Sequence, residues 1–126
     1  MKEMIKGKGA VGIAISFFSL RGMVSLPLEP CEYNLLYDDG LKIHKVKVIS
    51  CSFKSPYGVY MASIRTMGGN MPHLTTKTFD IESCDFVFIV TDALDMFNIP
   101  SHAITAKRQI SLNVYAVYRV VLGDVV

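Results

Sequence analysis

A tight turn in the first half of the chain places the strongest limit on what it can fold into. Two apolar-rich segments, residues 33–37 and 41–52, are joined by Asp38-Asp39-Gly40. An Asp-Gly pair supplies the positive backbone dihedrals that a short connection between antiparallel strands requires. We therefore read these three residues as a turn rather than as metal ligands, and the sequence predicts a β-hairpin.

Alternation along the second strand of this hairpin sorts its side chains into two sets. Successive side chains of a strand point to opposite faces of the sheet. One face is expected to carry Ile43, Lys45, Lys47 and Ile49, and the other to carry Lys42, His44, Val46 and Val48.

The remaining pattern predicts an α/β (α+β) domain with a central mixed sheet flanked by helices. A helix over residues 8–21 should end at Gly22, with that glycine in the left-handed region. At 126 residues the chain is long enough for one core, and we expect a single domain over residues 1–126. Further strands are expected at residues 23–26, 59–66, 85–91, 96–99 and 112–121, a loop at 67–77, and a short helix or turn from Pro100.

The predicted first helix is apolar almost all round, with only Gly12, Ser16 and Ser19 to interrupt it. A helix of this kind is usually buried on more than one side. Two explanations remain open: packing between the sheet and the C-terminal segment, or a subunit interface.

Composition narrows the class of protein. Hydrophobic residues make up 51% and charged residues 19% of the chain, so we expect part of the surface to meet another subunit. No apolar run is long enough to span a bilayer, and we expect an intracellular, cytoplasmic protein. The three cysteines form no CxxC pair and suggest neither a disulfide framework nor a zinc site.

The order of several short motifs resembles the PD-(D/E)XK nuclease superfamily. They are most similar to the small homing endonucleases of group I introns, with the pattern KG..GE, GY.V..P, YDLV.DDG and VQVKT. The resemblance covers roughly residues 8–113 and implies a restriction-endonuclease-like core. The matching segments are Lys8-Gly9, Gly22-Met23-Val24, Pro27, residues 33–36, Asp38-Asp39-Gly40, residues 46–49, Gly58-Val59-Tyr60, the FVFIV segment at 86–90 and the NIP segment at 98–100.

The resemblance places the family's working residues at four positions that carry other side chains here. The helix glutamate falls on Ile13, the metal-binding aspartate on Asn34, the glutamine on Lys47 and the lysine on Ile49. Such nucleases hold a divalent cation with carboxylate and backbone oxygens. A neutral amide and an added positive charge should bind metal poorly, so the resemblance implies the fold without catalytic residues, metal or cofactor.

Two alternatives stay open. The active site could have migrated onto nearby acids, which would make the chain a Mg²⁺-dependent DNA endonuclease with ligands among Glu29, Glu32, Asp38 and Asp39. Alternatively, the chain could be a structural or protein-interaction module that has lost DNA binding.

Our favoured interpretation is a catalytically inactive protein that binds duplex DNA as a homo-oligomer, as a regulator or specificity subunit. The net charge of +2 gives only weak support, but the fold resemblance strengthens it. The candidate DNA-binding residues are Lys6, Lys8, Lys45, Lys47, Lys54, Arg65, Lys77, Lys107 and Arg108.

Overall fold

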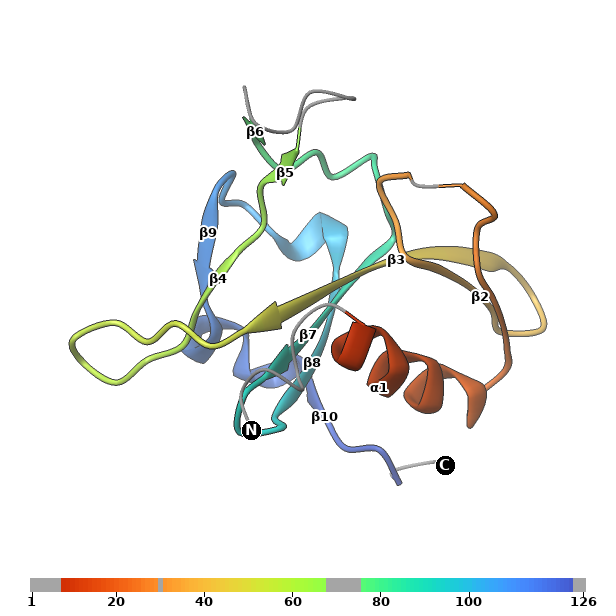
Figure 1. The fold of residues 1–126 in the computed structure, drawn as a ribbon, viewed down its shortest axis with the longest axis horizontal. Helices are drawn as coiled ribbons and strands as arrows, with labels where there is room; N and C mark the ends of the chain where they lie inside the picture. Colours follow the sequence, from red (N-terminus) through yellow and green to blue (C-terminus); the bar gives the residue numbers. More distant parts are fainter. Residues whose placement is uncertain (1–7, 30, 68–75, 124–126) are drawn as a thin grey trace.

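A six-stranded mixed sheet organises the chain in a computed structural model that describes residues 8–29, 31–67 and 76–123 (Figure 1). Strands β3 and β7 pair in parallel at its centre, and every other pair in this sheet is antiparallel. The strands, in their order across the sheet, are β1 (Met23–Ser25), β2 (Leu35–Asp38), β3 (Ile43–Cys51), β7 (Phe86–Thr91), β8 (Met96–Pro100) and β10 (Arg119–Val120).

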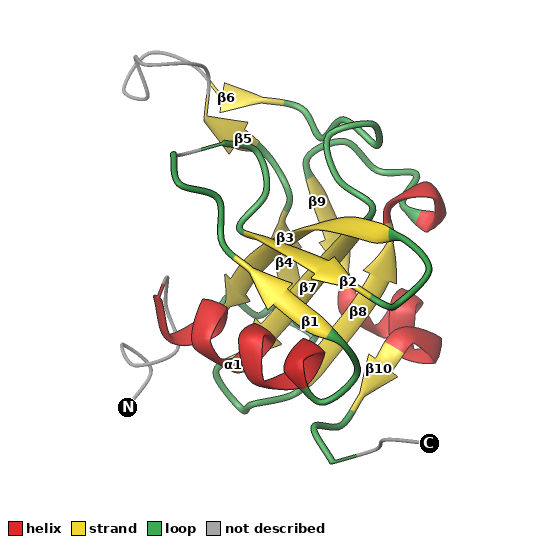
Figure 2. Ribbon diagram, turned by 90° about the vertical axis from the view of Figure 1, so that its right-hand side faces the viewer, coloured by secondary structure: helices red, strands yellow, loops and turns green. Residues whose placement is uncertain are grey.

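Helix α1 (Lys8–Ser19) covers one face of this sheet (Figure 2). Ala10, Ala14, Phe17 and Phe18 are buried at a spacing that puts them on one stripe of the helix. The rings of Phe17 and Phe18 lie 5.1 and 5.4 Å from the ring of Phe88 on β7. The sheet and this stripe together form one of two hydrophobic cores, which we call the helix-side core.

The opposite face of the sheet is covered by shorter elements. A two-stranded ladder of β4 (Met61–Ser63) and β9 (Gln109–Ser111) lies over it with two 3₁₀ helices, η2 (Ser101–Ala103) and η3 (Leu112–Tyr118). Together they bury the second cluster, the ladder-side core. A further two-stranded ladder joins β5 (Thr66–Met67) to β6 (Thr76–Lys77).

The expected class, a mixed α+β fold built on a central sheet, is confirmed, as is the β2–β3 hairpin. The strands expected at 85–91 and 96–99 are present as β7 and β8, which pair with each other. Side chains on β3 alternate as expected, with Val46 and Val48 in the helix-side core and Ile49 in the ladder-side core. Within the described ranges, no helix is both long and apolar enough to cross a membrane.

Gly22 was expected to end the helix in the left-handed region, and this prediction is wrong. The helix ends at Ser19, and the described glycines with positive φ are Gly40 and Gly58, not Gly22. A Cβ atom on Gly22 would lie 2.2 Å from the backbone oxygen of Asp38. The glycine is therefore needed because β2 approaches the backbone closely at this point, and not because of its dihedrals.

Two of the predicted strands are corrected. Residues 59–66 do not join the main sheet, because β4 pairs with β9 in a separate ladder. Residues 112–121 form η3 and the two-residue β10 instead of one strand. Leu112 and Tyr115 are buried three residues apart while Val114 and Val117 are exposed, and the backbone kinks at Tyr115, where two short 3₁₀ turns meet. Of the predicted loop at 67–77, residues 68–75 lie outside the described residues.

Candidate functional site

Asn34 binds the backbone of β3 just before β2 begins. Its backbone N–H donates to the oxygen of Val46 at 2.8 Å, and its Oδ1 accepts from the N–H of Val48 at 2.7 Å. The side-chain oxygen thus accepts from the backbone of β3 as a backbone carbonyl of a paired strand would. Asn34 lies beside Lys47, with its amide oxygen committed to the strand.

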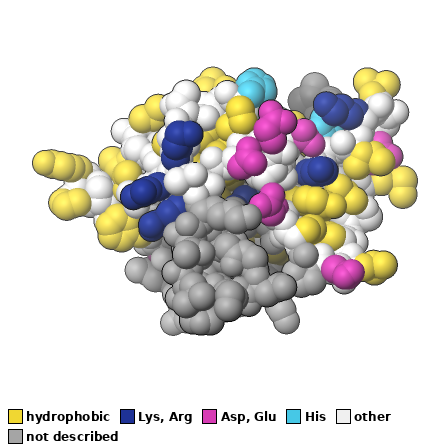
Figure 3. Space-filling view, turned by 90° about the horizontal axis from the view of Figure 1, so that it is seen from above, with side chains coloured by type: hydrophobic (Ala, Val, Ile, Leu, Met, Phe, Trp, Pro, Cys, Tyr) yellow, Lys and Arg dark blue, Asp and Glu magenta, His cyan; other side chains and the backbone are white. Residues whose placement is uncertain are grey.

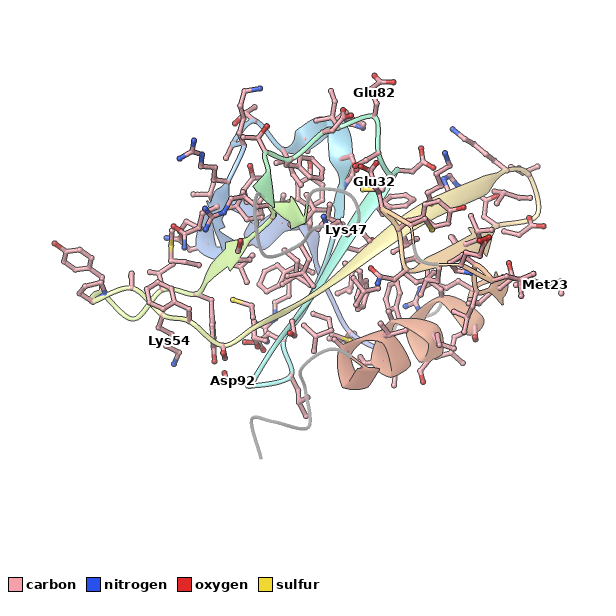
Figure 4. All side chains as sticks on the ribbon, turned by 45° about the horizontal axis from the view of Figure 1, so that its top comes forward. Met23, Glu32, Lys47, Lys54, Glu82 and Asp92 are labelled. Atoms are coloured by element: carbon pink, nitrogen blue, oxygen red, sulfur yellow. The ribbon has the colours of Figure 1, made fainter. Side chains whose placement is uncertain are left out.

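Lys47 is buried, with only 9% of its surface exposed. Burial lowers the pKa of its ammonium group. The charge of Cys84, where its thiol is ionised, and the charge of Glu32 oppose that shift. Figure 4 shows Lys47 on β3 with Glu32 close by, on the segment that leads into β2. The position that resembles the nuclease glutamine therefore holds a buried cation.

Cys84, a neighbour of Lys47, is paired with Ser101. The Sγ of Cys84 lies 3.3 Å from the Oγ of Ser101, and both residues are buried. Burial raises the pKa of the Cys84 thiol, so this group stays neutral at ordinary pH. Cys84 therefore adds no negative charge beside Lys47 at ordinary pH.

The four altered positions are not gathered in one place. Asn34 and Lys47 are neighbours across the β2–β3 edge, and Ile49 follows Lys47 on the same face. Ile13 is half-buried against the helix-side core, whereas Ile49 is half-buried against the ladder-side core. The two isoleucines extend two different cores.

The acids proposed for a migrated site are engaged in a turn or exposed. Asp38 accepts a hydrogen bond from the N–H of Gly40, and Asp39 accepts from the N–H groups of Leu41 and Lys42, each at 2.8 Å. Glu29 and Glu32 are exposed. In residues 8–29, 31–67 and 76–123, no three His, Cys, Asp or Glu side chains are grouped so that they could hold a metal ion.

His44 completes the hydrogen bonds of Asp39, with its Nε2 2.9 Å from Oδ2. This contact, followed by the backbone bonds from Leu41 and Lys42, lowers the pKa of the Asp39 carboxyl to about 2. The Asp39 carboxylate stabilises the turn of the β2–β3 hairpin.

Three basic candidates are brought together by the β4–β9 ladder. Ile64 N–H donates to the backbone oxygen of Arg108 at 2.9 Å, which places Arg65 beside the Lys107–Arg108 pair. All three basic residues are exposed. Figure 3 shows basic side chains on the left of this view with no acidic side chain among them, and further basic side chains on the right, where acidic ones also lie. We call Arg65, Lys107 and Arg108 the basic cluster.

The basic cluster belongs to stretches that carry no acidic residue. Residues 40–79 and 96–123 contain no aspartate or glutamate, although the whole chain has 11. Their basic residues are Lys42, Lys45, Lys47, Lys54, Arg65, Lys77, Lys107, Arg108 and Arg119. A net charge of +2 therefore conceals a pronounced separation of charge along the sequence.

The other basic candidates are dispersed. The Nζ of Lys45 lies 5.7 Å from the centre of the Tyr33 ring, and the Nζ of Lys54 lies 4.8 Å from that of Tyr60, beyond the other end of β3. Lys6 and the side chains of Lys8 and Lys77 lie outside the described residues.

Reasoning from the sequence missed some of the residues that surround Lys47. Nothing in the local pattern signals that Cys84 and Ser101 border Lys47, because the parallel pairing of β3 with β7 creates that proximity. The acid-free stretches, by contrast, could have been read directly from the order of charged residues.

Comparison with known proteins supports the fold. No protein-family model matches the sequence, and no curated protein matches it. Among solved structures the chain is similar to a bacterial homing endonuclease, I-Ssp6803I, with a TM-score of 0.72 and 22% sequence identity. The similarity covers 86% of this chain and 76% of that chain. The chain thus has a fold like that of a homing endonuclease.

Proposed function

We propose that this chain is a catalytically inactive protein of PD-(D/E)XK fold that binds duplex DNA as a homo-oligomer, as a regulator or specificity subunit. The observation that carries the proposal is the buried residue Lys47 within a homing-endonuclease-like fold. Fold similarity alone does not determine function, so the argument rests on the groups at the site.

Lys47 and Asn34 together argue against metal chemistry. A hard divalent cation prefers several anionic oxygens, and a buried positive charge beside the site repels it. The amide oxygen of Asn34 already accepts the Val48 N–H and brings no negative charge. Lys47 therefore supplies positive charge where the resemblance implies a metal environment, and Glu32 lies near enough to favour that charge.

The basic cluster supports contact with DNA. Exposed lysine and arginine side chains bind phosphates and release counterions, which gives affinity without reading sequence. Arg65, Lys107 and Arg108 are exposed and have no acidic residue near them in the sequence. Because Lys47 is buried, we assign phosphate contact to this cluster and charge neutralisation inside the protein to Lys47.

Assembly as a homo-oligomer is supported by apolar side chains at the β1 edge of the sheet. Met23 and Ile43 lie in one row across β1, β2 and β3, with Asp38 of β2 between them, and are 75% and 60% exposed. Leu41 in the adjoining turn is exposed too. Exposed apolar groups that gather in one place are typical of protein contacts.

An Ile43→Lys variant is expected to have a lower mass by light scattering than the unaltered chain. Val114→Lys is the matched control, because Val114 is exposed on η3, away from this edge. Equal masses for the unaltered chain and Ile43→Lys would remove this edge from the proposal.

The experiment for the whole proposal reads binding and cleavage in the same samples. Purified protein is incubated with mixed-sequence duplex DNA, with and without Mg²⁺ or Mn²⁺, and assayed for mobility shift and strand breaks. We expect a salt-dependent shift with no breaks, in metal or in chelator. The Asn34→Asp/Lys47→Gln variant, which restores two family residues, serves as a matched test of metal dependence.

Two outcomes would contradict the proposal. Metal-dependent breaks by the unaltered chain would favour a migrated site, and Asp→Asn changes at positions 38 and 39 would then abolish them. A protein that shifts no duplex at any salt concentration would favour an interaction module that has lost DNA binding.

A further inference from the structure

An arm projects from the sheet where β3 ends and β4 begins. Residues 53–60 extend beyond the other elements, on the left of Figure 1. A bridge between Lys54 and Tyr60 closes the arm, and Met61 N–H donates to the oxygen of Phe53 at 3.0 Å. The hydroxyl of Tyr60 donates to Asp92 on the β7–β8 turn. The base of the arm is therefore fixed to the main sheet.

The tip of the arm is held in one shape by Ser55. Its N–H donates to the oxygen of Val59 at 2.8 Å, and its carbonyl accepts from the N–H of Gly58 at 2.9 Å. Its Oγ also accepts from the N–H groups of Tyr57 and Val59 at 3.3 and 3.4 Å. Gly58, with φ of 80°, turns the chain back. The tip is ordered by its own backbone bonds.

This ordered tip presents an aromatic ring to solvent. Tyr57 is 92% exposed, and Phe53 at the base of the arm is 59% exposed. A tyrosine ring held in the open by a closed turn gains nothing from burial within its own chain. Little backbone entropy is lost when it binds a partner, because the backbone beneath it is already ordered. The ring itself has only two side-chain torsions to fix.

The surroundings of the arm favour a nucleic acid over a protein as that partner. The arm leads into β4, and the chain beyond β4 reaches Arg65 of the basic cluster. No aspartate or glutamate occurs between residues 40 and 79, and Lys54 adds a positive charge on the arm itself. An aromatic ring next to basic groups is the arrangement that stacks on bases while phosphates are held.

Tyr57 and the basic cluster are suitably spaced to bind one DNA molecule. Tyr57 and Arg65 are eight residues apart, which limits their separation to about 26 Å at 3.3 Å per residue. About eight base steps of a duplex, at 3.4 Å per step, cover the whole of this upper limit. A duplex held by the basic cluster can therefore extend as far as the tip of the arm.

We propose that Tyr57 stacks on a base of the DNA held by the basic cluster, at a step where the bases have come apart. This inference rests on the proposed function, since it requires DNA to be bound. It goes beyond that function by naming the form of DNA preferred: a duplex with an opened or unpaired step. Inserting a ring costs the unstacking of a base pair, so a duplex that is already open should bind more tightly.

The test compares two duplexes of the same flanking sequence, one continuous and one with a two-nucleotide bulge. We expect the unaltered chain to bind the bulged duplex about tenfold more tightly. Tyr57→Ala should lose this preference and keep its affinity for the continuous duplex, whereas Tyr57→Phe should retain the preference. Leu28→Ala is the matched control, because Leu28 is fully exposed and far from the arm in the sequence.

Other results would overturn the inference and separate it from the proposed function. Equal affinity of the unaltered chain for both duplexes, or an undiminished preference in Tyr57→Ala, overturns the role of Tyr57 and leaves DNA binding in place. Absence of binding to either duplex overturns both proposals. A change of mass by light scattering in Tyr57→Ala, with both affinities unaltered, would assign the arm to contact between copies of the chain.

Discussion

The two ends of strand β3 differ in charge and in exposure. At its start, the hairpin turn is acidic and locally satisfied: Asp39 accepts from the backbone of Leu41 and Lys42 and from His44. Beyond its end, the arm carries no acid and presents Tyr57 to solvent. Midway, Lys47 is buried. Strand β3 thus connects an acidic turn, whose carboxylates are hydrogen-bonded, to an arm that carries exposed basic and aromatic side chains.

This contrast bears on where along β3 the groups of the proposed DNA-binding site lie. The acids of the turn already have hydrogen-bond partners, and the centre of the strand holds a buried cation. The exposed groups suited to DNA lie toward the arm and the β4–β9 ladder. In the function proposed above, the centre of the strand has no metal chemistry and the DNA-binding groups lie at one end.

The largest effect is expected from removing the basic cluster. Arg65→Ala/Lys107→Ala/Arg108→Ala should lower DNA affinity by about two to three orders of magnitude in 0.1 M salt and reduce the log–log salt slope by about three. Mobility shifts over a range of salt measure both quantities. Lys42→Ala, next to the acidic turn, is the control and should change little. An equal loss from Lys42→Ala would break the contrast between the two ends.

Two glycines test how tightly each end is packed. Gly22→Ala should lower the free energy of unfolding by about 3 kcal/mol, because its Cβ would overlap the Asp38 oxygen at the acidic end. Gly58→Ala meets no atom within 4 Å and carries only the strain of its φ of 80°, about 1 kcal/mol. Urea unfolding of the two variants gives the comparison. Similar losses would show that the arm is packed as tightly as the turn.

The buried ammonium of Lys47 should make stability depend on pH. Burial lowers its pKa in the folded state below the ordinary 10.5, so the folded state loses the proton first as pH rises. Between the lowered pKa and 10.5 the unfolded state holds this proton more tightly than the folded state, so the free energy of unfolding rises with pH over that interval. Below the lowered pKa this gain is absent. Lys47→Met should therefore be more stable at neutral pH by about 1 kcal/mol, with the difference shrinking toward pH 10.5.

Chemical denaturation of both proteins at several pH values measures this difference. A constant gap between Lys47→Met and the unaltered chain would mean that Lys47 does not titrate differently in the two states.

A smaller pH effect is expected at the acidic turn. Hydrogen bonds lower the pKa of Asp39 from 3.8 to about 2 in the folded state, so the contribution of its carboxylate is complete above 3.8 and lost as pH falls toward 2. Thermal unfolding between pH 5 and 2 should show the melting temperatures of the unaltered chain and Asp39→Asn converging. Parallel curves would exclude a stabilising role for this charge.

The parts of the fold that depend on local signals could be predicted from the sequence. The Asp-Gly turn and the alternation after it located the β2–β3 hairpin, and the apolar run from residue 10 located α1. The segment 112–121 was mistaken for a strand because apolar content was weighed without its period. Leu112 and Tyr115 lie three residues apart, and that spacing favours a helical turn over a strand.

The candidate site could not be predicted in full, because it depends on contacts between residues that are far apart in the sequence. Ser63 pairs with Gln109 in the β4–β9 ladder, and this distant pairing is what places Arg65 beside Lys107 and Arg108. The burial of Lys47 likewise depends on elements that follow β3 by tens of residues, such as Cys84. Charge and identity could be read from the chain, whereas proximity and burial required the fold.

The most direct test of the central claim asks whether a metal ion enters at Asn34 and Lys47. Mn²⁺ is added to ¹⁵N-labelled protein, and selective broadening is followed at the amides of Leu35 and Val48, which flank these positions. We predict no selective broadening in the unaltered chain, and broadening in Asn34→Asp/Lys47→Gln, where an anionic oxygen replaces the amide and the cation is gone. Selective broadening at Leu35 and Val48 in the unaltered chain would contradict the account.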